Sequence, residues 1–162
     1  MLVLSPAAAA AQSSDDRIIV PGVRIGPWRL AMTLDELVKL NGPEVGRGPI
    51  QFPDMRSQLT LIGWPDRSLA VATPDGNHVC FLTLGIGGVP ASHATAEAIG
   101  APSRLAEVLK IYGPPTSQTV PRPGQKNLTY DRLGIDFQVL ANDRAFQVRI
   151  FKPGTAHRIW RL

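Results

Sequence analysis

His78 and Cys80 are the pair of residues whose types and spacing come nearest to a catalytic set. They stand two positions apart in a run that alternates like a β-strand, so both side chains should lie on one face. An imidazole beside a thiol can generate a thiolate nucleophile. No third residue that would orient the imidazole is apparent, and the apolar neighbours of Cys80 should raise its pKa. We therefore expect no enzyme, and keep a small exported thiol enzyme or hydrolase as an alternative.

Metal and phosphate sites find little support in the sequence. The three histidines, His78, His93 and His157, are scattered and show no metal-binding spacing. The stretch GIGGVP, Gly85 to Pro90, has proline where the third glycine of a dinucleotide-binding loop should stand. We interpret it as a linker, and the prediction is no cofactor and no metal.

The second part of the chain is basic. Residues 101–162 hold 10 Lys and Arg against 4 Asp and Glu, whereas residues 1–100 hold 7 against 9. A solvated basic face is the simpler explanation, and an anionic partner is the alternative. Basic and aromatic residues also mix near the C-terminus in a way that could suit nucleic acid: Arg149, Phe151, Lys152, Arg158 and Trp160. Because an exported protein seldom meets nucleic acid, an alternating edge strand is the preferred interpretation and no nucleic-acid partner is predicted.

The first residues predict export. MLVLSPAAAAAQSSDD passes from an apolar stretch to small and then polar residues, with Ala9 to Ala11 before Gln12. This pattern is typical of the end of a signal peptide. We therefore expect a signal-peptide remnant over residues 1–11, a flexible segment over 12–19, and a periplasmic or secreted protein. Cys80 is the only cysteine, so no intramolecular disulfide can form, and no apolar run is long enough for a transmembrane segment.

Two stretches of similar sequence predict two short helices. TLDELVKLNGPE spans residues 33–44 and RLAEVLKIYGPP spans residues 104–115. Thr33, with Glu36 three positions later, forms a capping-box pattern, and Ser103 is the expected cap of the second helix. Each helix should end at its Gly-Pro pair.

The segments after the two helices also correspond. Each has a loop, an aromatic residue with Asp-Arg, an alternating run, a turn and a second alternating run, which predicts an antiparallel hairpin. The turns are expected at residues 74–77 and 141–144. We therefore predict an α+β fold of two tandem helix-plus-antiparallel-hairpin repeats, residues 20–88 and 89–162, that form a helix layer on an antiparallel sheet.

The outer faces of the two predicted hairpins differ. In the second repeat the outward residues are polar and should face solvent: Asp136, Gln138, Gln147 and Arg149. In the first repeat they are small or apolar, so something must cover them: Ala70, Ala72, Cys80, Leu82 and Leu84. Either the other repeat or the Ile159-Trp160 tail packs there, or the face is a docking surface.

The two helix stretches carry a resemblance to a known group of proteins. Residues 25–44 resemble the turn-and-helix pattern of bacterial envelope proteins of the β-lactamase-inhibitory-protein type and of the small outer-membrane lipoproteins that assist β-barrel assembly. Residues 95–115 resemble a companion version of this pattern found in exported proteins of unknown function. The resemblance implies helices layered on an antiparallel sheet, and for the inhibitory type a tandem duplication whose sheet grips another protein. Ala31 replaces the usual glycine before Met32, the lipidated cysteine is absent, and no contact residue carries over.

The leading functional prediction is an exported, non-enzymatic binding or inhibitor-like protein. It would recognise a protein or a cell-envelope component, with an anionic partner as one option, through its sheet face and loops. The candidate binding residues are Trp64, Arg67, Tyr130, Arg132 and Arg149. The other alternative is a structural envelope protein that binds peptidoglycan or anionic lipid. The sequence leaves the oligomeric state open.

Overall fold

An eight-stranded antiparallel sheet forms most of the protein. The structure is a computed structural model that describes residues 14–51, 54–65, 69–85 and 92–161. The strand order is β4-β5-β6-β7-β11-β10-β9-β8, so the chain builds four strands from one edge to the middle and four more from the opposite edge. The strands are β4 (Gly46–Ile50), β5 (Leu59–Trp64), β6 (Leu69–Thr73), β7 (Phe81–Leu84), β8 (Ser117–Thr119), β9 (Gln125–Tyr130), β10 (Ile135–Leu140) and β11 (Ala145–Phe151).

The predicted fold class is wrong. The described residues form this sheet and a second, three-stranded antiparallel sheet of β1 (Ile19–Val20), β2 (Arg24–Ile25) and β3 (Trp28–Arg29), with only short helices. The described part of the chain is therefore mostly β, and each of the two helices α1 (Leu34–Asn41) and α2 (Leu105–Tyr112) is followed by four strands instead of one hairpin. The predicted hairpins correspond to β6–β7 and β10–β11, whereas β4, β5, β8 and β9 lie in the segments that were predicted to be loops.

The two eight-residue helices form where the caps predict. In α1 (Leu34–Asn41) the Thr33 hydroxyl accepts from the Glu36 backbone N–H, and the Glu36 carboxylate accepts from the Thr33 N–H. α2 (Leu105–Tyr112) begins one residue later than expected, with Arg104 as its N-cap, because the Ser103 hydroxyl accepts from the Gly100 N–H instead. Both helices end at a glycine with positive φ, which lets the glycine N–H bond back to the last turn.

The larger core lies on one face of the sheet. It joins the buried sides of α1 and α2 to the three-stranded sheet, through residues such as Leu37, Val108 and Trp28. Leu69 and Val71 of β6 face this core together with Leu82 and Leu84 of β7, because the register pairs Leu69 with Leu84 and Val71 with Leu82. The expectation that Leu82 and Leu84 share a face with Ala70 and Ala72 is therefore wrong by one residue.

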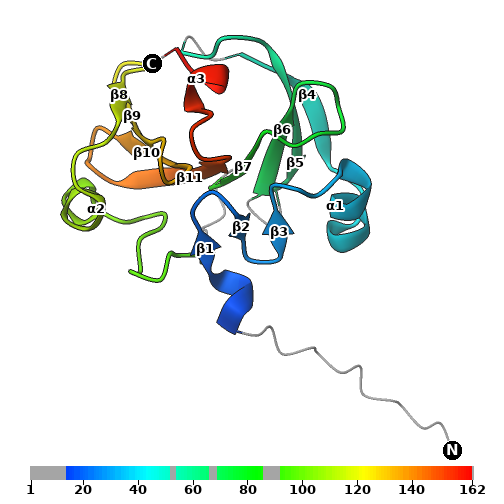
Figure 1. The fold of residues 1–162 in the computed structure, drawn as a ribbon, viewed down its shortest axis with the longest axis horizontal. Helices are drawn as coiled ribbons and strands as arrows, with labels where there is room; N and C mark the ends of the chain where they lie inside the picture. Colours follow the sequence, from blue (N-terminus) through cyan, green and yellow to red (C-terminus); the bar gives the residue numbers. More distant parts are fainter. Residues whose placement is uncertain (1–13, 52–53, 66–68, 86–91, 162) are drawn as a thin grey trace, which may run out of the picture.

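A smaller core covers the opposite face at one end. The helix α3 (Ala156–Ile159) and Trp160 pack with Met55 against Ala72, Phe81 and Phe151. The Arg56 N–H donates to the Ile159 carbonyl at 2.9 Å, which ties the 54–56 segment to the C-terminal tail. Figure 1 shows α1 and α2 at opposite ends of the curved sheet and α3 inside the curve. The prediction that the Ile159-Trp160 tail covers this face is thus confirmed for Ala72.

The predicted segment boundaries fall largely outside the described residues. The signal-peptide remnant and the junction between residues 88 and 89 both lie there. Within the predicted flexible segment, Ser14–Arg17 form a 3₁₀ helix and Ile19 is buried. No helix in the described part of the chain has the length and apolar character needed to cross a membrane.

Candidate functional site

Trp64 and Tyr130 are buried residues that hold the ends of the helices. They are 1% and 4% exposed. The Trp64 Nε1–H donates to the Gly42 carbonyl at 2.9 Å, and the Tyr130 hydroxyl donates to the Gly113 carbonyl at 2.9 Å. A helix end leaves its last carbonyls without partners in the helix, and these side chains supply one. In this structure both aromatic residues belong to the scaffold, and neither is presented to a partner.

Of the two loop arginines in the predicted binding set, the structure describes Arg132 but not Arg67. Arg132 is exposed in the turn between β9 and β10, next to Asp131, whose carbonyl accepts from the Gly154 N–H at 2.9 Å. It therefore lies on the surface beside the turn at residues 152–154. Arg67 lies outside the described residues.

Arg149 is buried, so the expectation of a solvated sheet face in the second half is wrong. Its side chain is 2% exposed and forms two hydrogen bonds, of 2.9 and 2.6 Å, to one carboxylate oxygen of Asp136, which is fully buried. The Trp160 ring lies over the guanidinium, 4.1 Å from its central carbon. The Thr129 hydroxyl donates to the other Asp136 oxygen. Arg149 is thus neutralised and enclosed, and in this structure it offers no surface to a partner.

This ion pair belongs to a transverse row that crosses the whole sheet. Each member is the register partner of the next: Gly46, Gly63, Ala70, Thr83, Arg149, Asp136, Thr129 and Ser117. The members of the row on β4, β5 and β6 are small residues, and those on β7, β11, β10, β9 and β8 are polar. Asp54 adds to the polar part, because it accepts from Asn127 at 2.7 Å and from Thr119 at 3.2 Å. On the strands from β7 to β8 the second face therefore carries a largely buried polar layer, which adjoins the smaller apolar core.

His78 and Cys80 do not form a catalytic dyad. Both precede β7, so they do not share a strand face as predicted. The exposed His78 ring pairs with Asp75, and the backbone N–H and ring of His78 hold the pKa of that carboxyl below its usual range. The Cys80 thiol donates to the Ala72 carbonyl at 3.2 Å, and burial raises its pKa to about 11. Among the residues that the structure describes, none is placed as a base for the thiol, and burial favours its protonated form.

The three histidines also stay apart. His93 is half-buried with its ring 5.4 Å from that of Trp28, and burial lowers the pKa of His93. His157 is exposed on α3. Within the described ranges no cluster of three or more histidine, cysteine or acidic residues could hold a metal ion.

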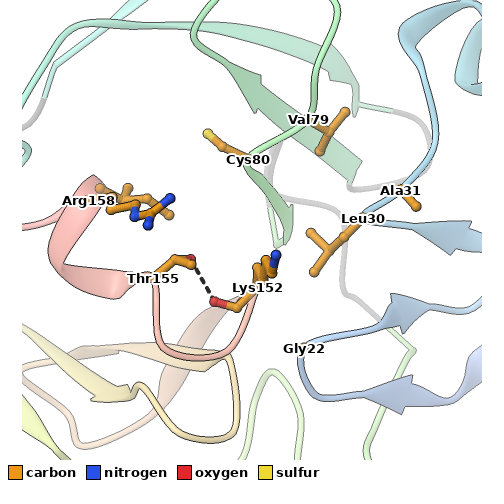
Figure 2. A pocket seen from close by; sticks show the side chains of 9 residues that line it. Gly22, Leu30, Ala31, Val79, Cys80, Lys152, Thr155 and Arg158 are labelled. Carbon is orange, nitrogen blue, oxygen red and sulfur yellow. Dashed lines mark hydrogen bonds between the residues drawn. The ribbon is translucent and has the colours of Figure 1, made fainter.

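A pocket of about 390 Å³ lies where three segments meet. Gly22, Leu30 and Ala31 come from the turns around the three-stranded sheet, Val79 and Cys80 precede β7, and the C-terminal segment supplies the rest: Lys152, Thr155, Arg158 and Ile159. Figure 2 shows the side chains of Leu30, Lys152 and Arg158 around the same open space. Its size lies within the range of small-molecule sites.

The positions of these pocket residues follow from local turns. Gly22 has a φ of +69°, and a Cβ there would lie 2.6 Å from Pro153, so glycine lets the β1–β2 turn approach the C-terminal segment. Thr155 is held by its hydroxyl, which donates to the Lys152 carbonyl at 2.6 Å. The sequence drew attention to Lys152 and Arg158 as basic residues near aromatics, but no pattern in it links them to Leu30 or Val79.

Comparisons with known protein families, curated proteins and solved structures find no match for this chain.

Proposed function

We propose that the chain is an exported, non-enzymatic binding protein whose partner is an anionic component of the cell envelope. The observation that carries the proposal is the charge of the second half. Nine of the ten Lys and Arg in residues 101–162 are exposed, and the tenth is Arg149 in its buried ion pair. Of the four acidic residues in that range, only Glu107 and Asp143 are exposed. The surface of this half is therefore more basic than its composition suggests.

The pocket offers a position where the anionic group of the partner could bind. Lys152 and Arg158 both line it, and neither forms an ion pair within the part of the chain that the structure describes. Arg132 lies on the neighbouring turn. Cations without a carboxylate partner attract anions over roughly 10 Å at about 0.1 M salt. A thiol enzyme has no comparable support, because Cys80 lacks a base and its thiol is protonated.

Sedimentation with vesicles tests the proposal. We expect retention on vesicles rich in anionic lipid, weaker retention on neutral vesicles, and loss of retention as salt rises from about 0.05 M to about 0.5 M, since salt screens exposed charges. The double substitution Lys152→Gln/Arg158→Gln should reduce retention more than the matched control Lys110→Gln/Lys126→Gln, which removes two exposed charges away from the pocket. Equal retention on neutral and anionic vesicles, or retention that ignores salt, would contradict an anionic partner.

A further inference from the structure

The walls of the pocket are apolar. Leu30, Ala31, Val79 and Ile159 present hydrocarbon to it. The two uncharged polar side chains in the wall spend their hydrogen-bond donors inside the protein, because Thr155 donates to the Lys152 carbonyl and Cys80 donates to the Ala72 carbonyl. A sugar or a nucleobase would therefore find few polar partners here and would lose hydrogen bonds to water.

The two cations at the pocket set a different requirement. Lys152 and Arg158 come from the same C-terminal segment, on either side of Thr155. Their charges favour an acid group beside them, while the apolar walls favour hydrocarbon. A ligand that satisfies both has an acid at one end and an apolar chain at the other.

We infer that this pocket binds a single molecule of an anionic amphiphile, such as a straight-chain carboxylate, with its acid at Lys152 and Arg158 and its chain against Leu30, Val79 and Ile159. This inference rests on the proposed function, because it names the ligand class of the same basic site. The amphiphile is bound as a monomer in the pocket, which differs from adsorption of the protein to an anionic surface.

Calorimetric titration with hexanoate, octanoate and decanoate, kept below their micelle concentrations, tests the inference. Affinity should rise about fourfold for each methylene that enters the pocket and then level off when the pocket is full. Octanol should bind more weakly than octanoate, and salt should weaken octanoate only. Because Cys80 lies in the pocket wall, bound decanoate should also slow its alkylation in proportion to occupancy.

Ala31→Phe provides a variant that fills the pocket without disturbing the core, since Ala31 lines the pocket and is exposed. We expect it to weaken decanoate binding by about tenfold or more. The matched control is Ala106→Phe on the exposed side of α2, which should bind decanoate like the unmodified protein. Affinity independent of chain length, or an Ala31→Phe variant that binds as well as its control, would overturn the inference.

The vesicle experiment separates the two proposals. If carboxylates fail to bind while retention on anionic vesicles persists, the pocket inference is wrong and the proposed function stands. If carboxylates bind with the expected chain-length dependence while anionic vesicles retain nothing, the pocket is a ligand site and the proposed envelope partner is wrong.

Discussion

The indole Nε1–H of Trp64 and the carbonyl oxygen of Gly42 are joined by a hydrogen bond of 2.9 Å. The bond runs from the end of β5 to the end of α1, and the Tyr130 hydroxyl makes the corresponding bond from the end of β9 to Gly113 after α2. In each half, an aromatic residue at the end of a strand thus ties the glycine that ends the helix to the sheet. Trp64 and Tyr130, which the sequence suggested as contact residues for a partner, therefore connect the helix ends to the sheet.

Replacing Trp64 or Tyr130 by Phe removes the donor and keeps an aromatic ring. Tyr130→Phe should lower the free energy of unfolding by about 1–3 kcal/mol, because the Gly113 carbonyl loses its partner. Trp64→Phe should cost more, because the smaller ring also leaves a cavity in the core. Urea unfolding measures the change, and vesicle retention of the folded variants should stay the same. A variant with unchanged stability but no vesicle retention would show that the substituted residue contacts the partner.

Arg149→Met should be among the most destabilising substitutions in the sheet. It leaves the Asp136 carboxylate buried without its cation, which costs about 3–5 kcal/mol. The double variant Arg149→Met/Asp136→Leu removes both charges and should recover much of this loss. A double-mutant cycle in urea measures the coupling, and effects of the two single changes that simply add would contradict a direct pair.

Gly134→Ala and Gly113→Ala form a matched pair, since both glycines have a φ of +71°. A Cβ at Gly113 meets nothing within 4 Å, whereas one at Gly134 would lie 2.2 Å from the Phe151 carbonyl oxygen and 2.8 Å from the Gly22 Cα. Gly113→Ala should cost about 1–3 kcal/mol from backbone strain alone, because its φ and ψ lie in a region that only glycine adopts readily. Gly134→Ala should cost clearly more in thermal or urea unfolding, and equal losses would mean that the turn at Gly134 moves freely.

The raised pKa of the Cys80 thiol predicts that the free energy of unfolding falls at alkaline pH. Its thiol pKa is about 11 in the folded chain against 9.0 for an unperturbed thiol, so folding favours the protonated form. This contribution is complete below about pH 9 and fades as pH rises towards 11, where it has fallen by about 2 kcal/mol. The difference in unfolding free energy between the unmodified protein and Cys80→Ala, measured across this range, isolates the effect from other titrating groups.

The same shift makes Cys80 slow to alkylate. At about pH 8 its thiolate population should be about a hundredfold below that of a free cysteine. Iodoacetamide should therefore label the native protein slowly and the denatured protein fast. Rapid labelling of the native protein near neutral pH would revive the thiol-enzyme alternative.

The helices could be predicted because their signals are local. The Thr33 cap with Glu36 and the glycines that follow each helix fix the ends within a residue. Ser103 misled by one position, since its hydroxyl bonds back to Gly100. The turn at residues 141–144 was also correct, because β10 ends at Leu140 and β11 begins at Ala145.

The sheet and the pocket could not be predicted because they depend on contacts distant in sequence. β4 reads Gly-Arg-Gly-Pro-Ile and carries no apolar alternation, so its place is set by pairing with β5. The β6–β7 connection is longer than the predicted turn. Leu82 and Leu84 therefore face the larger core with Leu69 and Val71, and not the opposite face with Ala70 and Ala72. The polar residues of β10 indicated solvent, yet Asp136 is enclosed because Arg149 neutralises it.

The meeting of β7 with β11 at the middle of the sheet has a consequence for how the chain folds. β7 pairs with β6 on one side and, from Phe81 to Leu84, with Phe151 to Val148 on the other. Among the described strands β11 comes last in the sequence, so one edge of β7 stays open until residues 148–151 pair with it. Closure over such a long stretch of sequence slows folding, and an open apolar edge is a template for aggregation. Truncation of even the last strand should therefore leave an aggregation-prone chain.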